Sequence, residues 1–468
     1  MGNIVYKACM STKIKHRQCI VAPATGPARG GLGVIRLSGE DALSTAKKFF
    51  KFRDKIKDVR SHQMYYGHFV DTNQSVVDDG YFVFFESPYS YTGEDTVELT
   101  VHGNPVTLNH MVDLICQNSS ARLAEPGEFT QRAFLNDKMN LTQAEAVAEF
   151  IHASSVEASR YAQLRLQGGL AQQIEQLYIL ALEVLAECEA DIDFPDENLP
   201  IEDKDHILKK LDNVIGSLQS LSTSYNATRK MHDGYKVAFL GQPNVGKSSL
   251  FNAILQEDRA LVSDIAGTTR DRIHESLLIE GCPVQLMDTA GLRADTKDSI
   301  EQAGIQLSLK SLEQADLVCL LTDNPEFIEW DAIVQAQQQY NFKLWNVINK
   351  VDLKPDLQKL HAPKDNTFVL SAKSKQGLDE FMAALTLLIQ NELSDEKVLL
   401  GNLRQKRLID RSLESFLSAK KSWLRGQAEE FVALELREGM SALMTLLGKE
   451  DITEEILDTV FSKFCVGK

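Results

Sequence analysis

The segment from Lys236 to Leu250 constrains this chain most, because an apolar run leads directly into Gly-x-x-x-x-Gly-Lys-Ser and then into a helix-forming stretch. A strand, a glycine-containing loop and a helix in this order form a phosphate-binding loop. Such a loop turns backbone N–H groups toward a triphosphate, adds the charge of a lysine and offers a serine hydroxyl to Mg²⁺. The segment predicts an α/β domain that binds a nucleotide through Asn244, Val245, Gly246, Lys247, Ser248 and Ser249.

Two segments downstream have the composition of loops that sense the γ-phosphate. The first is polar and contains Gly267, and its Thr269 is expected to be a second Mg²⁺ ligand. The second follows an apolar strand expected over Val284–Met287, where Asp288 can hold the metal through water. The residues expected to contact the nucleotide here are Ser263, Asp264, Ile265, Ala266, Gly267, Thr268, Thr269, Asp288, Thr289, Ala290 and Gly291.

Two further segments predict which base is bound. A strand expected over Leu344–Ile348 leads into Asn349-Lys350-Val351-Asp352, and the Asp352 carboxylate can accept hydrogen bonds from N1–H and the 2-amino group of guanine. Adenine lacks these donors, so a site that buries this carboxylate should reject ATP. Ser371-Ala372-Lys373 is expected to complete the pocket through the Ala372 N–H. The sequence therefore predicts a G domain specific for GTP.

The residue that follows Asp288-Thr-Ala-Gly291 excludes one way of orienting the water that attacks GTP. Leu292 stands where a Ras-type enzyme carries a glutamine that orients the attacking water, and leucine forms no hydrogen bond. The acidic candidates for that role are Asp295, Asp298 and Glu301, although such carboxylates are most often only solvated. The Asn244 side-chain oxygen could coordinate a monovalent cation beside the phosphates.

Length and composition limit the remaining possibilities. A chain of 468 residues is expected to form two or three domains. The net charge of −16 and the pI near 5.2 argue against nucleic-acid binding by bulk attraction, although a local basic face stays possible. The seven cysteines are scattered singly, and the sequence lacks a membrane-length apolar run and a secretory signal. We expect a cytoplasmic protein.

The regions around the G domain differ in pattern. Short alternating runs from about residue 18 to 138 predict an α+β domain, with strands over Gly33–Leu37, Gly80–Phe85 and Thr96–Val101. Gly30-Gly-Leu-Gly33 is interpreted as a tight turn into a strand rather than a nucleotide loop. Thr142-Gln-Ala-Glu145 predicts a capping box and a helix beginning near residue 142. Helices are expected to reach Ile192 and to resume from about Glu202 to Lys230.

Helical periodicity returns from about residue 394 to the end, with breaks expected near Gly401 and Gly426. Helices on both sides of the α/β module predict that it is inserted into a helical domain whose two parts meet in space. Between the two glycines, seven basic residues accompany two acidic ones, which is compatible with an RNA-backbone face or with a solvated helix face. The basic residues are Arg404, Lys406, Arg407, Arg411, Lys420, Lys421 and Arg425.

Several segments resemble, in order, the MnmE (TrmE) family of tRNA-modification GTPases, over about residue 19 to the last residue. They are Ser90-Tyr-Thr-Gly-Glu-Asp95, Pro126-Gly-Glu-Phe-Thr-Gln-Arg-Ala-Phe-Leu135, Leu141-Thr-Gln-Ala-Glu-Ala146, Asp193-Phe-Pro-Asp-Glu197, Asp264-Ile-Ala-Gly-Thr-Thr-Arg-Asp271, Asp288-Thr-Ala-Gly-Leu-Arg293 and the terminal Cys465-Val-Gly-Lys468. Gln242, Asn104 and Leu307-Ser308 depart from the family pattern.

The resemblance implies a multidomain α/β protein with an N-terminal α+β folate-binding-type domain, a helical domain built from two chain segments and an inserted Ras-like G domain. The boundaries that we expect are 1–18 for an N-terminal extension, 19–138 for the tetrahydrofolate-binding and dimerisation domain, 139–230 and 393–468 for the helical domain, and 231–392 for the G domain.

The family's chemistry supplies further expectations. With the flavoprotein MnmG, such proteins add a (carboxymethyl)aminomethyl group to C5 of the wobble uridine, position 34, of certain tRNAs, using a tetrahydrofolate one-carbon donor. By resemblance, 5-formyl-tetrahydrofolate or a related folate is bound by Arg36, Glu98, Lys138 and Lys468, and Cys465 takes part in the modification. The family forms homodimers, and a heterotetramer with MnmG is expected.

The resemblance also accounts for the missing glutamine. The family's G domains pair across the nucleotide and use K⁺, here expected at Asn244, Ser263, Ile265 and Thr268, with Mg²⁺ at Ser248 and Thr269 and the attacking water oriented by Glu301. Two alternatives share the G domain. A ribosome-assembly GTPase should carry an added RNA-binding module, and a regulatory switch would need neither the folate contacts nor Cys465.

Overall fold

The computed structural model divides the chain into two compact units. Unit 1 comprises Met1–Ala148, Arg165–Leu211 and Glu414–Lys468, and unit 2 comprises Glu149–Leu164 and Asp212–Leu413. The structure describes residues 18–153, 155–193, 204–242, 244–257, 276–279, 282–288, 312, 315–324, 331–340, 342–354, 366–393, 400–450 and 452–468. Four helices run across the division, namely α5 (Leu141–His152), α6 (Val156–Leu166), α8 (Lys204–Asp233) and α13 (Leu403–Leu424).

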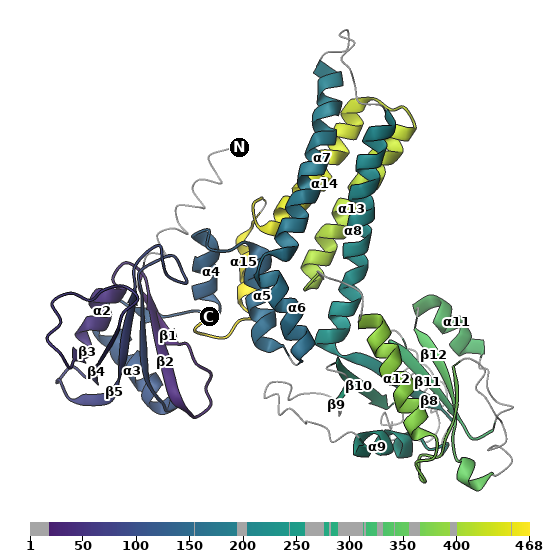
Figure 1. The fold of residues 1–468 in the computed structure, drawn as a ribbon, viewed down its shortest axis with the longest axis horizontal. Helices are drawn as coiled ribbons and strands as arrows, with labels where there is room; N and C mark the ends of the chain where they lie inside the picture. The colour runs from purple at the N-terminus through teal and green to yellow at the C-terminus, as the bar shows by residue number, and fades with distance from the viewer. Residues whose placement is uncertain are drawn as a thin grey trace, which may run out of the picture. The chain divides into compact units, whose positions relative to one another are not determined.

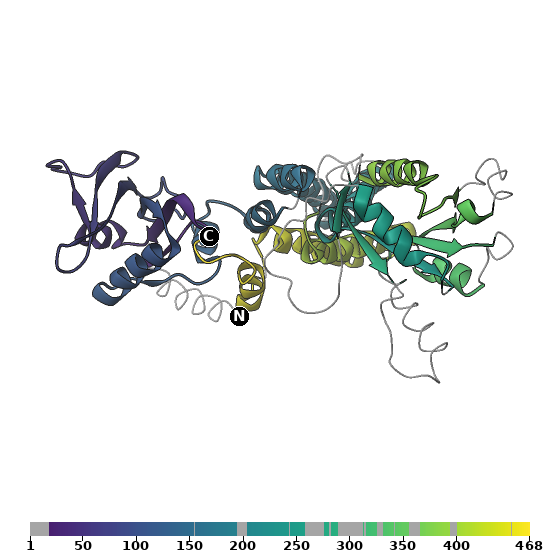
Figure 2. The same ribbon diagram turned by 90° about the horizontal axis from the view of Figure 1, so that it is seen from below.

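Unit 1 contains a seven-stranded sheet (Figures 1 and 2). In spatial order its strands are β3 (Phe50–Phe52), β4 (Met64–Val70), β5 (Val76–Phe85), β6 (Thr96–Gly103), β2 (Gly30–Ser38), β1 (Ile20–Pro23) and β7 (Arg122–Leu123). Neighbouring strands are antiparallel except β1 and β7, which are parallel. The three strands expected in this region are confirmed, each within a longer strand.

Alternation along these strands gives the sheet one buried face. Phe69, Phe82 and Leu99 point into a core that α2 (Ala42–Lys48) and α3 (Pro105–Asn118) cover. Asn104, which departs from the family pattern, caps α3 by accepting a hydrogen bond from the Val106 N–H. On the opposite face, Met64, Tyr66 and Tyr81 of β4 and β5 are exposed.

The expectation of a tight turn at Gly30–Gly33 was wrong. These residues belong to β2, and their pairing with β6 contains a register shift. A Cβ on Gly103 would lie 2.6 Å from the carbonyl oxygen of Gly30, and one on Gly33 would lie 2.7 Å from a methyl group of Leu108. The glycines therefore allow β2, β6 and α3 to approach closely, which is a packing role within the strand.

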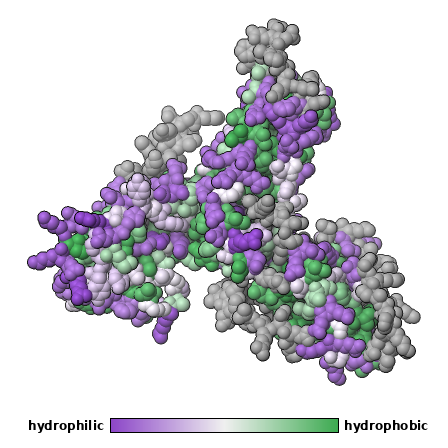
Figure 3. Space-filling model, in the orientation of Figure 1, coloured by the Kyte–Doolittle hydropathy of each residue, from purple (hydrophilic) through white to green (hydrophobic). Residues whose placement is uncertain are grey.

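The helices of unit 1 bring distant chain segments together. In Figure 1, α7 (Gly169–Asp193) lies beside α14 (Glu429–Leu447), and ion pairs Arg437–Glu189 (2.6 Å) and Lys449–Glu175 (2.9 Å) join them. The helical domain is thus built from two chain segments, as predicted. Figure 3 shows hydrophobic residues along the surface of the helices. Ile179 and Leu182 of α7 are exposed.

Helix ends differ from the predictions in two places. The box at the start of α5 is formed by Asn140 and Gln143, since each side chain accepts a hydrogen bond from the other's backbone N–H at 3.0 Å. The predicted Thr142–Glu145 box was therefore displaced by two residues, and Thr142 is buried inside the helix. A further break at Gly448, in the left-handed conformation, separates α14 from α15 (Glu454–Phe461).

Unit 2 contains a six-stranded sheet in the order β13 (Thr367–Val369), β12 (Lys343–Ile348), β11 (Leu317–Thr322), β8 (Tyr235–Gly241), β10 (Cys282–Asp288) and β9 (Ser276–Ile279). All neighbours are parallel except β9, which is antiparallel to β10. Its other described elements are α9 (Lys247–Glu257), the 3₁₀ turn η2 (Val351–Leu353), α11 (Asp331–Tyr340) and α12 (Leu378–Leu393).

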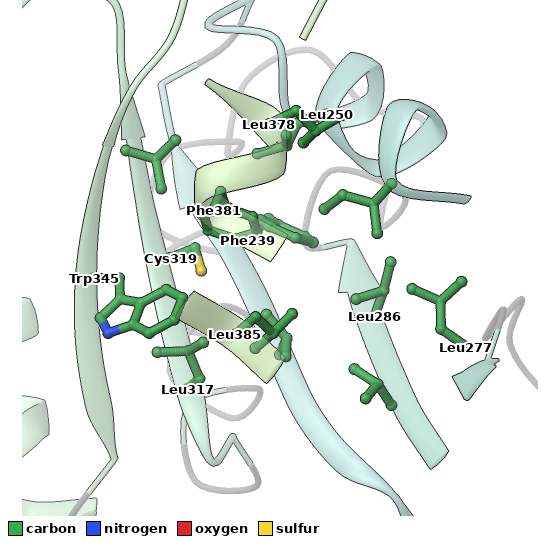
Figure 4. Packing of buried hydrophobic residues seen from close by; sticks show 14 of the residues in the cluster. Phe239, Leu250, Leu277, Leu286, Leu317, Cys319, Trp345, Leu378, Phe381 and Leu385 are labelled. Atoms are coloured by element: carbon green, nitrogen blue, oxygen red, sulfur yellow. The ribbon is translucent and has the colours of Figure 1, made fainter. Parts of the chain in front are cut away.

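Apolar residues fill both faces of this sheet, as expected of parallel strands. Figure 4 shows one of the two clusters, in which Phe239 and Trp345 from the strands pack with Phe381 of α12. The other cluster includes Leu240, Val318 and Ile333. This packing holds the carboxyl ends of β8, β11 and β12 at one edge, where open α/β sheets bind ligands.

Polar contacts fix the end of α8 to the opposite edge of the sheet. Arg229 pairs with Asp316 at 2.5 Å, and Lys230 pairs with Glu392 of α12. Lys343 reaches the same glutamate at 2.7 Å. Within the described residues, every helix is too short or too polar to cross a membrane.

Candidate functional site: a nucleotide edge and a charged N-terminal pocket

The loop between β8 and α9 has the geometry of a phosphate-binding loop. Gly241 and Gly246 have φ angles of 153° and 99°, and Asn244 has a φ of 63°. The Lys247 ammonium donates hydrogen bonds to the carbonyl oxygens of Gly241 and Gln242, both at 2.9 Å. The lysine thus folds back over the loop to where a phosphate charge would lie, and Ser248 follows it in the first turn of α9.

Asn349 joins this loop to the predicted base pocket. Its side-chain amide donates to the Val245 carbonyl at 2.9 Å and accepts from the Ala372 N–H at 3.0 Å, and the residue is buried. A Cβ on Gly246 would lie 2.3 Å from the Asn349 Nδ2 atom, so only glycine fits there. Asn349 therefore holds the phosphate loop and the Ala372 loop together.

The remaining base-pocket residues also lie at this edge. The Ser371 hydroxyl donates to the Asp352 carboxylate at 2.7 Å, which fixes the acceptor expected to read guanine. Lys350 has a left-handed backbone with φ 65° and ψ 34°. Lys373 is exposed beside Ala372. The structure brings together the phosphate-loop and base-pocket residues that the sequence predicted.

Some predicted residues fall outside the described part. Asp288 ends β10, but its side chain is not among those described. The others are Ser263, Asp264, Ile265, Ala266, Gly267, Thr268, Thr269, Thr289, Ala290, Gly291 and Glu301. No group of three or more metal-binding side chains occurs among the residues whose placement is described.

A second cluster of charged residues lies at the N-terminal sheet of unit 1. Arg36 of β2 and Glu98 of β6 face each other across the sheet and pair at 2.8 Å. The Arg36 guanidinium lies 5.3 Å from the ring centroid of Tyr91 and 5.6 Å from that of Phe129. This combination of a fixed cation, a carboxylate and aromatic faces suits a flat heterocycle that carries hydrogen-bond donors.

The last residues of the chain reach this cluster. Val466 forms an isolated antiparallel bridge with Pro126, and a Cβ on Gly467, whose φ is 97°, would lie 2.0 Å from the Pro23 carbonyl oxygen. Burial and the Arg36 charge lower the pKa of Lys468, while Glu98 and Cys465 act in the opposite direction. Lys468 therefore lies within electrostatic reach of Arg36 and Glu98, and Cys465 is exposed beside it.

Lys138 contacts the neighbouring loop. Its ammonium donates to the Pro88 carbonyl at 2.9 Å, and Tyr91 of the same loop faces Arg36. The Tyr91 hydroxyl shares a hydrogen bond with Thr130 at 2.9 Å. Burial raises the Tyr91 pKa above its ordinary value. The structure thus connects Lys138 to the pocket through the loop.

Sequence reasoning missed the ionic network beneath this loop. Arg132 of α4 (Glu128–Leu135) is fully buried and pairs with Glu94 at 2.9 Å and Glu128 at 2.8 Å. Arg122 contacts Glu128 through both of its terminal nitrogens, at 2.6 and 2.7 Å. Ser38 donates to Glu94 at 2.8 Å. The sequence signals were that Glu94, Glu128 and Arg132 lie within segments that resemble the family, and that Glu128 precedes Arg132 by four residues, the spacing of a helical ion pair.

Comparisons with known proteins show the family to which the chain is similar. The model of the MnmE helical domain matches residues 141–465, and that of the GTP-binding protein TrmE N-terminus matches residues 19–138. A tRNA modification GTPase MnmE of Aquifex aeolicus is 40% identical over 456 residues, which are 97% of this chain and 100% of that protein. Those of Syntrophotalea carbinolica and Nitrosomonas europaea are each 38% identical, with 96% of this chain and 99% of the relative covered.

Proposed function

The chain belongs to the MnmE family of tRNA modification GTPases, and from that premise we propose that it couples GTP hydrolysis to a folate-dependent modification of the wobble uridine, position 34, of certain tRNAs. The proposed product carries a (carboxymethyl)aminomethyl group on C5, and the flavoprotein MnmG is the proposed partner. The observation that carries the proposal is the position of the C-terminal tail: Val466 bridges Pro126, and Gly467 packs on Pro23, which lies opposite Ile35, the neighbour of the Arg36 that pairs with Glu98. A GTPase switch without chemistry of its own has no need for this arrangement.

The N-terminal pocket fits the proposed cofactor, 5-formyl-tetrahydrofolate or a related folate. Glu98 can accept hydrogen bonds from the donor edge of a pterin, and the half-buried Tyr91 offers a ring face, whereas Phe129 is fully buried. The charges of Arg36, Lys138 and Lys468 suit the glutamate carboxylates of a folate. The bound folate would supply a one-carbon unit, while these residues bind and orient it.

Cys465 is the residue of this chain that we propose to take part in the modification reaction. It is exposed, whereas Cys19, Cys188, Cys282 and Cys319 are buried. Burial raises the pKa of the Cys19 and Cys282 thiols to about 12, so these two are poor nucleophiles at neutral pH. The Gly467 contact with Pro23 fixes the tail on which Cys465 stands.

For GTP hydrolysis, we propose that Lys247 leaves its carbonyl partners to meet the phosphates. Ser248 and Thr269 are the proposed Mg²⁺ ligands, and Asn244, Ser263, Ile265 and Thr268 are proposed to hold K⁺ when two G domains pair. The left-handed conformation of Asn244 in the phosphate loop supports its part in this site. Glu301 is the proposed residue that orients the attacking water.

The proposed assembly is a cytoplasmic homodimer that forms a heterotetramer with MnmG. The exposed face of β4 and β5 supports pairing through the N-terminal sheet, because Tyr66 and Tyr81 pack edge to face there beside the exposed Met64. Apolar and aromatic residues of this kind are enriched at protein interfaces.

Substitution of Cys465 by serine tests the coupling of the two activities. Purified Cys465→Ser protein should hydrolyse GTP at the same rate as the protein without the substitution. In a deletion strain that carries this variant, nucleoside analysis should show that the tRNA lacks the modified wobble uridine. The buried Cys319→Ser variant is the matched control and should retain both activities. Full modification with Cys465→Ser would exclude a chemical role for this thiol. If tRNA from the deletion strain were unaltered, the modification function itself would be excluded.

A further inference from the structure

Asp323, which the sequence analysis did not single out, directly follows β11 at the nucleotide edge of the G-domain sheet. β11 and β12 are parallel with Thr322 opposite Ile348, so Asp323 leaves the sheet beside Asn349 and Lys350. The Lys350 ammonium contacts the Asp323 carboxylate at 3.1 Å. An acidic residue from one strand end thus contacts the lysine of the guanine motif on the next.

Several hydrogen bonds fix the backbone turn that carries this carboxylate. The Thr322 hydroxyl accepts from the Asn324 N–H at 3.1 Å, and the Thr322 carbonyl accepts from the Asn349 N–H at 2.8 Å. The Lys354 ammonium donates to the Asp323 carbonyl at 2.8 Å. The Asp323 turn is therefore built into the same hydrogen-bonded edge as the base pocket.

The other polar residues of the guanine motif are already held in place. Asn349 contacts Val245 and Ala372, and the Asp352 carboxylate accepts from Ser371. Lys350 lies between them, with a left-handed backbone conformation that is unfavourable for a residue other than glycine. Its flexible four-carbon side chain loses conformational entropy when it becomes ordered. An anchor for this side chain would complete the preorganisation of the motif.

We propose that Asp323 is a positioning residue of the guanine site, which holds the Lys350 side chain in place before the nucleotide arrives. A lysine stem can cover apolar surface while its ammonium stays at a polar partner. With Asp323 as that partner, the stem is available to line the base pocket beside Asp352. Asp323 acts through Lys350, so its effect belongs to nucleotide affinity and not to the hydrolysis step.

The competing explanation is an exposed ion pair without functional effect. Such pairs contribute about 0–1 kcal/mol, so the positioning role is expected to change the GDP dissociation constant by up to about fivefold. A purely structural role would lower the melting temperature without this change. The two explanations differ in whether the effect of Asp323 depends on Lys350, which a double-mutant cycle measures.

The experiment is a titration of a fluorescent GDP analogue into full-length protein carrying Asp323→Asn, Lys350→Gln or both. Asp323→Asn should weaken binding about three- to fivefold, with an unchanged kcat and a raised KM for GTP. In the Lys350→Gln background, the same substitution should change the dissociation constant less than about 1.5-fold. Asp323→Glu should restore most of the affinity.

Lys343→Gln supplies the matched control, because it removes an ion pair, to Glu392, from the other end of β12. It should leave GDP affinity unchanged. Equal losses from Asp323→Asn in both backgrounds, a loss confined to kcat, or an unchanged dissociation constant would each overturn the proposal. If unmodified protein did not bind GDP, the guanine site itself would be wrongly assigned, which is a separate failure.

Discussion

The proposed guanine site takes its contacts from short segments at one edge of a parallel sheet, whereas the proposed folate site takes Arg36, Tyr91 and Lys468 from distant parts of the chain. In the first, loops are joined mainly through neutral groups, such as the Asn349 amide between the Val245 carbonyl and the Ala372 N–H. In the second, a buried network around Arg132 lies beneath the loop that carries Tyr91. Substitutions should therefore disrupt the two sites for different reasons. Backbone strain should disrupt the guanine site, and unpaired charge should disrupt the folate site.

The largest expected effect comes from Arg132→Met, which leaves the carboxylates of Glu94 and Glu128 without their buried partner. Removing one member of a buried ion pair costs about 3–5 kcal/mol. Urea unfolding, monitored by hydrogen exchange in β1 and α4, should detect this loss of stability. Folate binding should be lost as well. GDP affinity should not change.

Arg437→Met is the control for that experiment, since the Arg437–Glu189 pair is exposed and should contribute at most about 1 kcal/mol. Similar losses from both variants would show that burial of the Arg132 network does not set its contribution. Unpaired buried charge would then not be the reason why the N-terminal pocket is disrupted.

Gly246→Ala should produce the next largest effect, now at the guanine site. The added Cβ would meet the Asn349 amide at 2.3 Å, and the φ of 99° is unfavourable for alanine. Strain and a disrupted hydrogen bond together cost about 3 kcal/mol, which is roughly a 100-fold loss of GDP affinity. Gly216→Ala, within α8 and with open space at its Cβ, should bind GDP normally in the same titration.

These two sites also differ in how far the sequence predicted them. The phosphate loop and the base-pocket loops lie at one edge of the sheet, as expected, because they are short motifs that adjoin strands, and parallel strands place their carboxyl ends at one edge. The Arg132 network was missed because only its Glu128 pair is local, one turn away on α4, whereas Glu94 and Arg122 join it only after the sheet and α4 have packed. The α5 cap shows the same limit locally, since Asn140 and Thr142 are both acceptable caps by composition. Which of them begins the helix depends on the burial of Thr142.

Gly467→Ala should affect only the N-terminal pocket. Its Cβ would lie 2.0 Å from the Pro23 carbonyl, so the tail that carries Cys465 and Lys468 must move. We expect about a tenfold loss of 5-formyl-tetrahydrofolate affinity by calorimetry, equivalent to about 1.4 kcal/mol. The rate of GTP hydrolysis by the isolated protein should stay unchanged. An unaltered folate affinity would indicate that the tail does not contribute to the pocket.

Acid should weaken the ionic network beneath the N-terminal pocket. Burial acts to raise the pKa of Glu128, but hydrogen bonds from Arg122, the Glu125 N–H and Arg132 outweigh it, so the folded-state pKa lies below 4.5. A lowered carboxyl pKa stabilises the fold fully above the unfolded value, and this contribution is lost as the pH falls from 4.5 through the folded value. Each unit of lowering is equivalent to about 1.4 kcal/mol. Urea midpoints measured across this range should fall less steeply for Glu128→Gln than for unmodified protein.

The smallest expected effect is the alkaline limit of folate binding. Burial and the Arg36 charge lower the pKa of Lys468 below 10.5, despite the opposing charges of Glu98 and Cys465. A carboxylate ligand favours the protonated amine, so affinity should decline, about twofold at the midpoint, as the pH rises through this lowered pKa. Lys468→Arg keeps its charge in this range and should move the decline to higher pH in calorimetric titrations. If both proteins lost affinity over the same pH range, another group would be responsible for the decline. Lys468 would then not be one of the charges that distinguish this pocket from the guanine site.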